Sequence, residues 1–335
     1  MADTTRIRDV IVVGSGPAGY TAAIYTARAG LDTLLIEGHE PGGALVVAGE
    51  VDNYPGIDPF VSGPVLADAM RRQAQHFGAE LRPGYVDRFD LGDESKTVRI
   101  RDAQHHSRAL ILAMGSAPRL LDVPGECGLL GRGVSTSAKR DGAQFTGRDV
   151  AVIGGGDGAV EEALHLVALA RHVTLIHHRR RLRASAIAVA RLRAHPNVAI
   201  LPSTEVLAVL GGQHVTGVRI RDSRHAGDSS IAVAAVFVAV GQTPCSDLLA
   251  GLVDLDAGGH VLAKDNTTRT SAEGVFAAGD LIDRRYRQAI TAAASGCAAA
   301  LDAERWLSHS SCPTTDSTTG RKDLRRDRTP AHHRD

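Results

Sequence analysis

The sequence has few cysteines and no long apolar segment. Its four cysteines lie far apart, and no two of them have the CxxC spacing of a dithiol or metal-binding motif. We therefore expect separate reduced thiols and no bound metal at Cys127, Cys245, Cys297 and Cys312. No apolar run approaches the roughly 20 residues that cross a bilayer, and the N-terminus leads directly into a predicted strand instead of a signal peptide. We expect a cytoplasmic protein without a membrane segment.

Neither sign of charge is in excess, since Lys plus Arg and Asp plus Glu each number 38. This balance gives no overall field that attracts nucleic acid or a membrane surface, and it favours small-molecule chemistry. Aromatic residues make up only 4% of the chain, whereas apolar residues make up 43% and glycines number 36. Such a composition is typical of a globular protein with tight turns, and 335 residues suit about two domains.

Two segments of the chain share one pattern, in which a short β-branched run is followed by a glycine turn, an alanine-rich helix and a second short strand. One copy runs from Asp9 to Glu37 and the other from Asp149 to Arg179. Further short strands are predicted in RALILAMGSAPR, VAILPSTEVLAVLGG, VTGVRIRD and IAVAAVFVAVG. The alternation of strands and helices predicts an α/β protein with two Rossmann-like dinucleotide-binding domains.

The first glycine turn has the spacing of a dinucleotide site. Gly14, Gly16 and Gly19 occupy G-x-G-x-x-G, where the first allows a tight turn, the second admits a pyrophosphate and the third lets the helix approach the sheet. Glu37 ends the next strand, where a carboxylate can accept hydrogen bonds from ribose hydroxyls and repels a 2′-phosphate. The pattern favours FAD or NAD over NADP, with Ser15, Pro17 and Ala18 completing the turn.

The second glycine turn repeats the pattern as G-x-G-x-x-A, with Gly154, Gly156 and Ala159 at its fixed positions and Asp157 between them. Where the first copy has an acid, this copy has a basic run. Guanidinium groups form charge-assisted and often bidentate bonds to phosphate, which predicts NADPH as the ligand. The candidate 2′-phosphate ligands are His177, His178, Arg179 and Arg183.

With both turns located, residues 6 to 307 resemble the low-molecular-weight thioredoxin reductases of bacteria. The resemblance is carried by GSGPAGYTAAIYTARAG, PGGALVVAGEVDNYPG, LAMGSAPR, GRGVSTSAKRDG, GGGDGAVEEAL and FAAGDLIDRRYRQAITAAASGCAAALDAERWL. It implies a three-layer ββα architecture in which an NADPH domain, residues 117–244, is inserted into an FAD domain made of residues 1–116 and 245–307. The resemblance also implies flavin contacts from Gly42, Gly43, Asn53, Gly279, Asp280, Arg287, Gln288 and Ala289.

The redox motif of that family is Cys-Ala-Thr-Cys-Asp, and the aligned residues here are Ser137, Ala138, Lys139, Arg140 and Asp141. Both thiols are replaced. Asp141 matches the residue that serves the family as proton donor, although it could equally pair with Arg140 or cap the helix. In the basic run, His178 aligns with the first arginine of the family's NADP pair and Arg180 with an acidic residue, so the positive charge is kept.

Disulfide reduction requires a sulfur pair that accepts electrons from the flavin and then attacks a partner as thiolate. Neither Ser137 nor Arg140 can do this. We therefore expect an enzyme that moves hydride from NADPH to FAD and delivers electrons directly to a small molecule, such as oxygen or a quinone, or to a small redox protein. The first alternative is a non-catalytic NADPH/FAD-binding sensor or partner protein. The second is ordinary thioredoxin-disulfide reductase activity.

Three features lie outside these sites. His105 with His106, and His332 with His333, are interpreted as solvated surface pairs rather than metal ligands. Residues 308–335 are rich in Ser, Thr, Arg, Asp and His, and are predicted to form a disordered tail. A helix is predicted from Gln288 to Leu307, and it would face a neighbouring chain if the homodimer of the family is kept.

Overall fold

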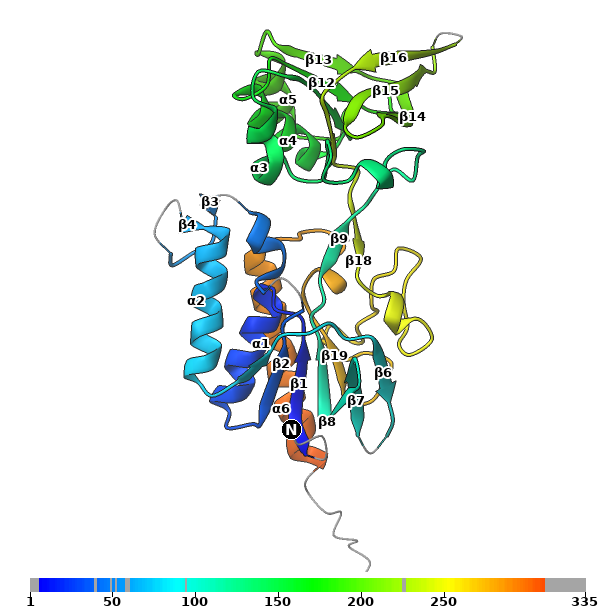
Figure 1. The fold of residues 1–335 in the computed structure, drawn as a ribbon. Coiled ribbons are helices and arrows are strands. Elements are labelled where there is room, and N and C mark those ends of the chain that lie inside the picture. The colour runs from blue at the N-terminus through cyan, green and yellow to red at the C-terminus, as the bar shows by residue number, and fades with distance from the viewer. Residues whose placement is uncertain are drawn as a thin grey trace, which may run out of the picture.

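A computed structural model describes residues 6–38, 41–48, 50–51, 53–57, 61–93, 95–224 and 227–310. These residues form two α/β units, joined by a pair of short strands (Figure 1). The polar segment from residue 311 onward, which includes Cys312, His332 and His333, lies outside the described residues. Within the described residues, no helix is long and apolar enough to cross a membrane.

The first unit is built on a seven-stranded sheet in which parallel and antiparallel strands are combined. Its order is β5-β2-β1-β8-β7-β6, and β19 also pairs with β8. β1, β2, β5, β8 and β19 are parallel, whereas β6, β7 and β8 form an antiparallel meander. The strands are β1 (Ile7–Val13), β2 (Thr33–Ile36), β5 (Glu80–Arg82), β6 (Arg88–Leu91), β7 (Lys96–Ile100), β8 (Ala103–Leu112) and β19 (Val275–Ala277).

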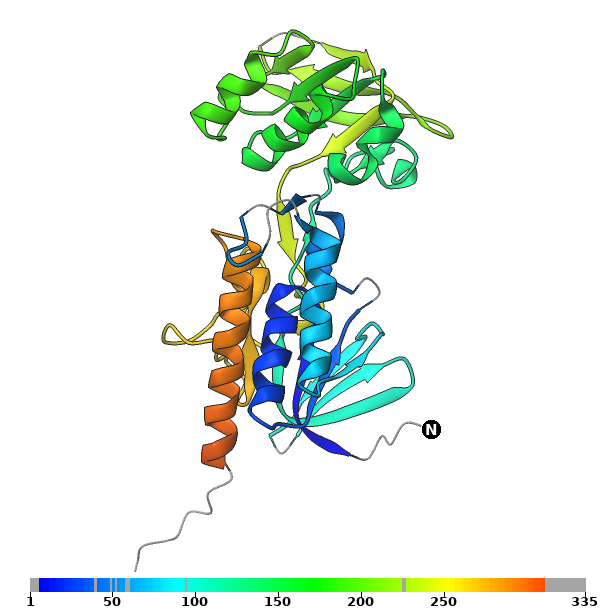
Figure 2. The same ribbon diagram turned by 90° about the vertical axis from the view of Figure 1, so that its left-hand side faces the viewer.

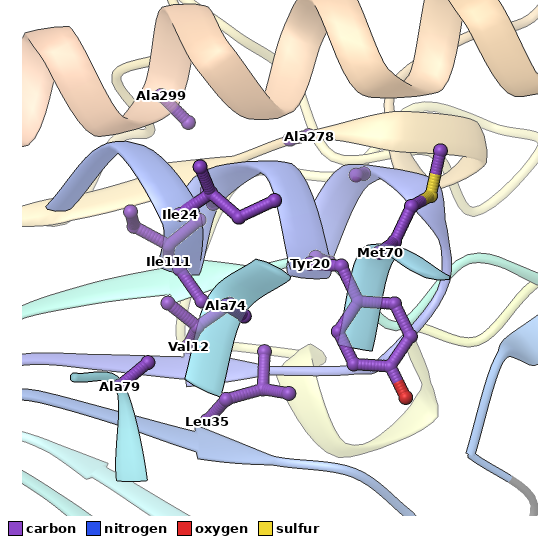
Figure 3. Packing of buried hydrophobic residues seen from close by; sticks show 14 of the residues in the cluster. Val12, Tyr20, Ile24, Leu35, Met70, Ala74, Ala79, Ile111, Ala278 and Ala299 are labelled. Carbon is purple, nitrogen blue, oxygen red and sulfur yellow. The ribbon is translucent and has the colours of Figure 1, made fainter. Parts of the chain in front are cut away.

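Three helices lie side by side on one face of this sheet (Figure 2). They are α1 (Pro17–Arg28), α2 (Gly63–His76) and α6 (Ala289–Ser310), with a small ribbon of β3 (Glu50–Val51) and β4 (Val61–Ser62) before α2. Small residues in α1 and α6 allow a close approach, and apolar side chains fill the space between helices and sheet. Figure 3 shows this core, including Val12, Leu35 and Ile111 from the sheet, Tyr20 and Ile24 from α1, and Met70 and Ala74 from α2.

The second unit has a five-stranded parallel sheet between two other layers. Its order is β10-β17-β11-β12-β13. Alternate residues of β11 face opposite sides, since Val150 and Val152 pack against helices while Ala151 and Ile153 pack against a three-stranded antiparallel sheet. The elements are β10 (Val134–Ser135), β11 (Asp149–Ile153), β12 (His172–Ile176), β13 (Val198–Leu201), β17 (Ala235–Val238), α3 (Ala138–Asp141), α4 (Asp157–Val167), α5 (Ala186–Arg193), β14 (Thr204–Gly211), β15 (Val215–Asp222) and β16 (Asp228–Ala232).

The chain passes twice between the units. β9 (Ser116–Pro118) leaves the first unit, and β18 (Gln242–Pro244) returns to it as its antiparallel partner. All strands of the second unit lie between residues 134 and 238, while β19 and α6 complete the first unit (Figure 1). The expected α/β fold with two Rossmann-like parts is therefore confirmed. The boundaries at residues 116 and 244 fall at the paired strands and stay predictions.

The last helix differs slightly from the sequence prediction. It extends to Ser310, three residues into the segment that we assigned to a disordered tail. The helix continues there because neither proline nor glycine occurs between Leu307 and Pro313. The remaining part of the predicted tail lies outside the described residues.

Candidate functional site

The first glycine turn closes against the end of β8. Gly14 has a φ of 109°, and a Cβ built there would lie 2.2 Å from the Ala113 carbonyl oxygen. A Cβ at Gly19 would lie 1.7 Å from the Gly14 oxygen, so any side chain at either position would force the turn apart. A Cβ at Gly16 would meet no atom within 4 Å. Two of the glycines are thus required for packing, while the third leaves open space beside the backbone, as a pyrophosphate requires.

Helix α1 begins at this turn without an anionic group of its own. Pro17 occupies the first position of the helix, and no side chain caps the helix. The first turn of α1, all of whose residues the structure describes, contains no Asp or Glu. The N-terminal N–H groups and the helix dipole therefore favour an external anion. Ser15 connects the turn to its surroundings, because its hydroxyl donates to the Glu37 carbonyl oxygen at 2.6 Å and accepts from the Gly42 amide at 3.2 Å.

Glu37 lies directly after β2 and is 3% exposed. Its carboxylate accepts hydrogen bonds from the Tyr20 hydroxyl at 3.0 Å and from Nε and Nη2 of Arg71 at 2.7 and 3.0 Å. Since a carboxylate has about four acceptor positions, one remains for a ribose hydroxyl. Burial and the neighbouring carboxylate raise the pKa of Tyr20, which keeps its hydroxyl a donor.

Arg71 changes the electrostatics expected from the sequence. Its guanidinium compensates the charge of Glu37, so repulsion of a 2′-phosphate is weaker than an unpaired carboxylate would give. Neither Arg71 nor Tyr20 was identified from the sequence. Arg71 is on α2, 34 residues from its partner, and no local pattern marks it.

Segments from both ends of the chain meet at the start of α1. A Cβ at Gly43 would lie 3.0 Å from the Gly16 Cα, and one at Gly279 would lie 2.9 Å from the Ala18 Cβ. Near the start of α6, the Asn53 amide donates to the Gln288 side chain at 3.2 Å. The structure therefore brings together most of the residues implied by the resemblance.

The loop before α6 is held by one carboxylate. Asp283 accepts hydrogen bonds from the backbone amides of Arg285, Tyr286 and Arg287, each at 2.8 Å. Arg287 has a φ of 50° and an exposed side chain, and Ala289 is the first residue of α6. These contacts fix the backbone that leads into the helix, while the Arg287 side chain stays exposed.

Asp280 lies beside the strands that connect the two units. Burial raises the pKa of its carboxyl group, although Ser116 opposes the shift. The Ser116 hydroxyl lies 3.1 Å from Oδ2 of Asp280 and 2.5 Å from Oε1 of Gln242. A hydroxyl has one proton, so it donates to one of these groups at a time. Sequence reasoning missed Ser116 and Gln242, because they meet Asp280 only through the pairing of β9 and β18.

The second glycine turn has similar packing. A Cβ at Gly154 would lie 2.3 Å from the Ala239 carbonyl oxygen and 2.8 Å from the Ala159 Cβ, while one at Gly156 would meet nothing within 4 Å. Asp157 is the first residue of α4, and its carboxylate accepts a hydrogen bond from the Ser185 amide at 2.8 Å. The acid therefore holds the loop that leads into α5.

The basic run divides into a buried histidine and exposed cations. His177 is 4% exposed, and burial, aided by His178, lowers its pKa, so it is neutral at pH 7. Arg179 and Arg183 are exposed, and the Arg183 amide donates to the Gly155 carbonyl oxygen at 2.7 Å. His177 and His178 line a cavity of about 220 Å³ with Gly154, at the carboxyl ends of β11 and β12. Parallel sheets bind ligands at such strand ends.

The segment aligned with the redox motif forms a short capped helix. Ser137 precedes α3, and its Oγ accepts a hydrogen bond from the Arg140 amide at 3.3 Å. The Arg140 guanidinium pairs with Asp141 at 2.9 Å, and the Ser135 hydroxyl donates to Asp141 at 2.6 Å. Burial disfavours the charged form of Asp141, but these two partners outweigh it and lower its pKa. An ionised, paired Asp141 fits the pairing alternative better than a proton donor at neutral pH.

One more carboxyl group lies beneath this helix. The Ala138 amide donates a hydrogen bond to Oε2 of Glu162 on α4, and burial raises the pKa of Glu162. Lys139 is exposed, as is the Arg140 side chain. The end of α3 therefore presents two cations to solvent above a partly buried carboxyl group.

The remaining histidines and cysteines include one correction. The prediction of a solvated pair is wrong for His105, which is 6% exposed and whose Nε2 has no hydrogen-bond partner among the described residues. It lies on β8, where side chains alternate between faces, and period-two burial overrides its polarity. Cys127, Cys245 and Cys297 are free thiols, and no group of metal-binding side chains occurs in the described part of the chain.

Comparison with known proteins gives a consistent result. The model of the pyridine nucleotide-disulphide oxidoreductase family matches residues 8–296. Thioredoxin reductase of Mycolicibacterium smegmatis is 53% identical over 92% of this chain and 99% of its own length. Thioredoxin reductase of Streptomyces clavuligerus is 46% identical over 90% of this chain and 94% of its own.

Solved structures agree with these sequence matches. Thioredoxin reductase of Lactococcus lactis in its FR conformation is 34% identical and superposes with a TM-score of 0.84, covering 90% of this chain and 99% of its own. The enzyme of T. acidophilum is 30% identical, with a TM-score of 0.81 over 91% and 99% of the two chains.

Proposed function

Because the chain belongs to the thioredoxin reductase family of pyridine nucleotide-disulphide oxidoreductases, whose cofactors are FAD and NADPH, we propose that it is an NADPH oxidoreductase with a direct route to its acceptor. FAD bound at the first turn would supply hydride acceptance from NADPH and two-electron transfer to an acceptor, without a dithiol relay. The acceptor is a small molecule or a small redox protein.

The observation that supports a direct route is the pair Ser137 and Arg140. The Ser137 hydroxyl caps α3, and the Arg140 side chain is exposed and paired with Asp141. Neither group can form a disulfide or act as a thiolate. Among the described cysteines, Cys127, Cys245 and Cys297 are free thiols that lie far apart in the sequence.

The two glycine turns fit the two cofactors differently. At the first turn, the open space beside Gly16, the uncapped start of α1 and the remaining acceptor position of Glu37 suit the pyrophosphate and ribose of FAD. Gly42, Gly43, Asn53, Gly279, Asp280 and the Arg287–Ala289 segment would complete the flavin site. At the second turn, Gly156 and the exposed guanidinium groups of Arg179 and Arg183 would hold NADPH.

The surface near α3 favours a negatively charged acceptor, although uncharged acceptors are also tested. Lys139 and Arg140 are exposed on one turn, and exposed cations raise the local concentration of anions. One relative, from Mycobacterium leprae, is a bifunctional thioredoxin reductase/thioredoxin, so a small redox protein is one acceptor to test. Oxygen and quinones are the others.

The proposal is tested by two measurements. Mixing the purified yellow protein with NADPH under anaerobic conditions should bleach the flavin, and stopped-flow mixing with each acceptor should then restore its colour. Reduction of a disulfide reagent through added thioredoxin should stay at the level without enzyme. A flavin that stays oxidised in NADPH would contradict the proposal and favour a binding protein, while rapid thioredoxin reduction would refute a lost relay.

A double substitution separates the relay from the rest of the enzyme. Ser137→Cys with Arg140→Cys should introduce disulfide reduction, because position 137 caps α3 and position 140 lies three residues later within this helix. Arg140→Cys alone is the matched control and should stay inactive, since one thiol cannot form the internal disulfide. If both variants remain inactive while NADPH reduces the flavin normally, then disulfide reduction requires further residues besides the two cysteines.

We also propose that the protein is a homodimer. Tyr25, Ile290 and Leu301 are exposed apolar side chains on α1 and α6, the face expected to meet a second chain. Sedimentation equilibrium of the purified chain tests this, and a monomer at micromolar concentration would contradict it.

A further inference from the structure

A second and larger cavity lies in the NADPH-side unit. It has a volume of about 1060 Å³ and runs between α5 and the edge strand β13. This edge faces away from the strands β9 and β18 that lead to the other unit (Figure 1). Electron transfer from the flavin therefore does not explain the cavity, and any ligand in it has another role.

The floor of the cavity is apolar. Val198 and Ile200 project from the same face of β13, and Val189 and Ala190 approach from α5. Pro202 closes the end beyond the strand. A floor of this kind binds the apolar part of a ligand by removing it from water.

The rim of the cavity is cationic, because Arg180, Arg181 and Arg193 all line it. Their side chains are exposed, and none of them forms an ion pair within the described residues. The charge is concentrated locally: residues 163–204 contain seven arginines and no Asp or Glu, although the whole chain has equal numbers of basic and acidic residues. Such a rim attracts anions.

These arginines are separate from the candidate 2′-phosphate ligands. Arg179 and Arg183 do not line this cavity, and neither do the glycines of the second turn. Gly154 lines the smaller cavity instead, and His177 borders both. The two spaces are thus neighbours that share one buried histidine.

We propose that the larger cavity is a binding site for an amphipathic organic anion, with an apolar body on β13 and α5 and a carboxylate, sulfonate or phosphate on the three arginines. Its volume of about 1060 Å³ is slightly above the usual range for small-molecule sites, about 300–1000 Å³, so the ligand need not fill it. The negative charge of the ligand also lowers the positive potential at Arg179 and Arg183. The ligand therefore weakens nucleotide binding partially, without occupying the nucleotide site.

Fluorescence titration of the full chain with anilinonaphthalene sulfonate tests the site, since this probe combines an apolar body with one anionic group. Two variants on exposed positions of α5 are informative. Ala190→Trp fills the cavity without changing charge, and Arg193→Glu reverses one rim charge. Arg148→Glu is the matched control, because Arg148 is exposed in the same unit and does not line the cavity.

The expected result is saturable binding of the probe that Ala190→Trp abolishes, that Arg193→Glu weakens by about three- to tenfold and that Arg148→Glu leaves unchanged. Uncharged phenylnaphthylamine should bind more weakly. Saturating 2′,5′-ADP should weaken binding only partially.

Three results would overturn the proposal. Unchanged binding in both α5 variants would place the probe elsewhere, and complete competitive displacement by 2′,5′-ADP would assign the cavity to the nucleotide site. Tight binding of polyglutamate without binding of the probe would identify an acidic protein as the partner instead. Circular dichroism and flavin content establish that each variant is folded.

Discussion

At the scale of single residues, the Glu37 carboxylate depends on a partner that is partly exposed. Arg71 donates two hydrogen bonds to it from α2, and the Arg71 side chain is 36% exposed. Removing the arginine leaves a buried carboxylate with only Tyr20 as donor, and an unsatisfied buried group costs about 1–3 kcal/mol. Solvent that reaches the Arg71 site lowers this cost toward the smaller value.

Arg71→Met should therefore lower the free energy of unfolding by about 1–2 kcal/mol in urea titrations. The neighbouring substitution Arg72→Met is a matched control, since Arg72 is 69% exposed and its ion pair with Asp68 lies on the helix surface. It should change stability by less than about 0.5 kcal/mol. Equal effects of the two substitutions would show that the Glu37 pair contributes nothing specific.

His105 makes stability depend on pH. Burial, followed by the nearby charges of Arg82 and Arg8, lowers its pKa in the folded state. Between this lowered pKa and the ordinary value of about 6.5, the unfolded chain binds more protons than the folded one. The stabilisation of the folded state that comes from keeping His105 neutral is therefore fully present above about pH 6.5. It is lost as the pH falls through the lowered pKa of the folded state.

His105→Gln should reduce the loss of stability as the pH falls below about 6.5, because the substituted side chain does not titrate. His165 and His177 also have lowered pKa values, so a smaller dependence of the same sign should remain. Urea titrations at a series of pH values measure the slope. The exposed residue His195 supplies the control His195→Gln, and an identical slope in both variants would exclude His105 as a cause.

At the scale of elements, α6 crosses the start of α1 at very close range. A Cβ at Gly296 would lie 2.1 Å from the Ala18 carbonyl oxygen, so only glycine allows the two backbones to approach in this way. The contact holds α1 against α6 at the turn where the first nucleotide is expected. Its geometry connects packing of the last helix with the shape of the first site.

Gly296→Ala should lower stability by about 1–3 kcal/mol, because the added methyl group pushes the helices apart. It should also weaken FAD retention, measured by fluorescence of released flavin. Gly158→Ala on α4 is the matched control, since a Cβ there meets nothing within 4 Å and removes backbone freedom from the unfolded chain. If Gly296→Ala is as stable as the control, the helices can separate without cost.

Local sequence patterns predicted helices and strands well where neighbouring residues alone determine the structure. The apolar run Val10–Val13 and the following glycines predicted β1 and the start of α1, because burial on both faces and a tight turn leave little choice of residue. The end of α6 was placed three residues too early, since the change to polar composition precedes the last helical turn. Boundaries depend on such weak local preferences.

At the scale of the whole molecule, equal numbers of charges conceal an uneven distribution. Residues 163–204 are basic without any acid, so a positive field is expected around Arg179 and Arg183, the candidate 2′-phosphate ligands. This field should make the affinity for 2′,5′-ADP fall severalfold as salt is raised, because ions screen exposed charges.

Arg179→Ala should weaken binding of 2′,5′-ADP by about tenfold and leave binding of 5′-AMP nearly unchanged, since only the former has a 2′-phosphate. Isothermal titration calorimetry measures both. Arg148→Ala is the control, and a similar loss of affinity for both nucleotides would argue against a role in phosphate recognition.

The sequence alone determined the two glycine turns and the residues Ser137 and Arg140, on which the proposed loss of the dithiol rests, because tight turns, phosphate contacts and redox chemistry each require particular residues at fixed spacing. Only the tertiary structure decided that Arg71 neutralises Glu37, that Ser116 lies between Asp280 and Gln242, and that His105 is buried. Arg71 and Ser116 are distant in sequence from their partners, and His105 lies on a strand whose side chains point alternately to its two faces. Their charge state and hydrogen bonds depend on which surfaces the folded chain brings together and removes from water.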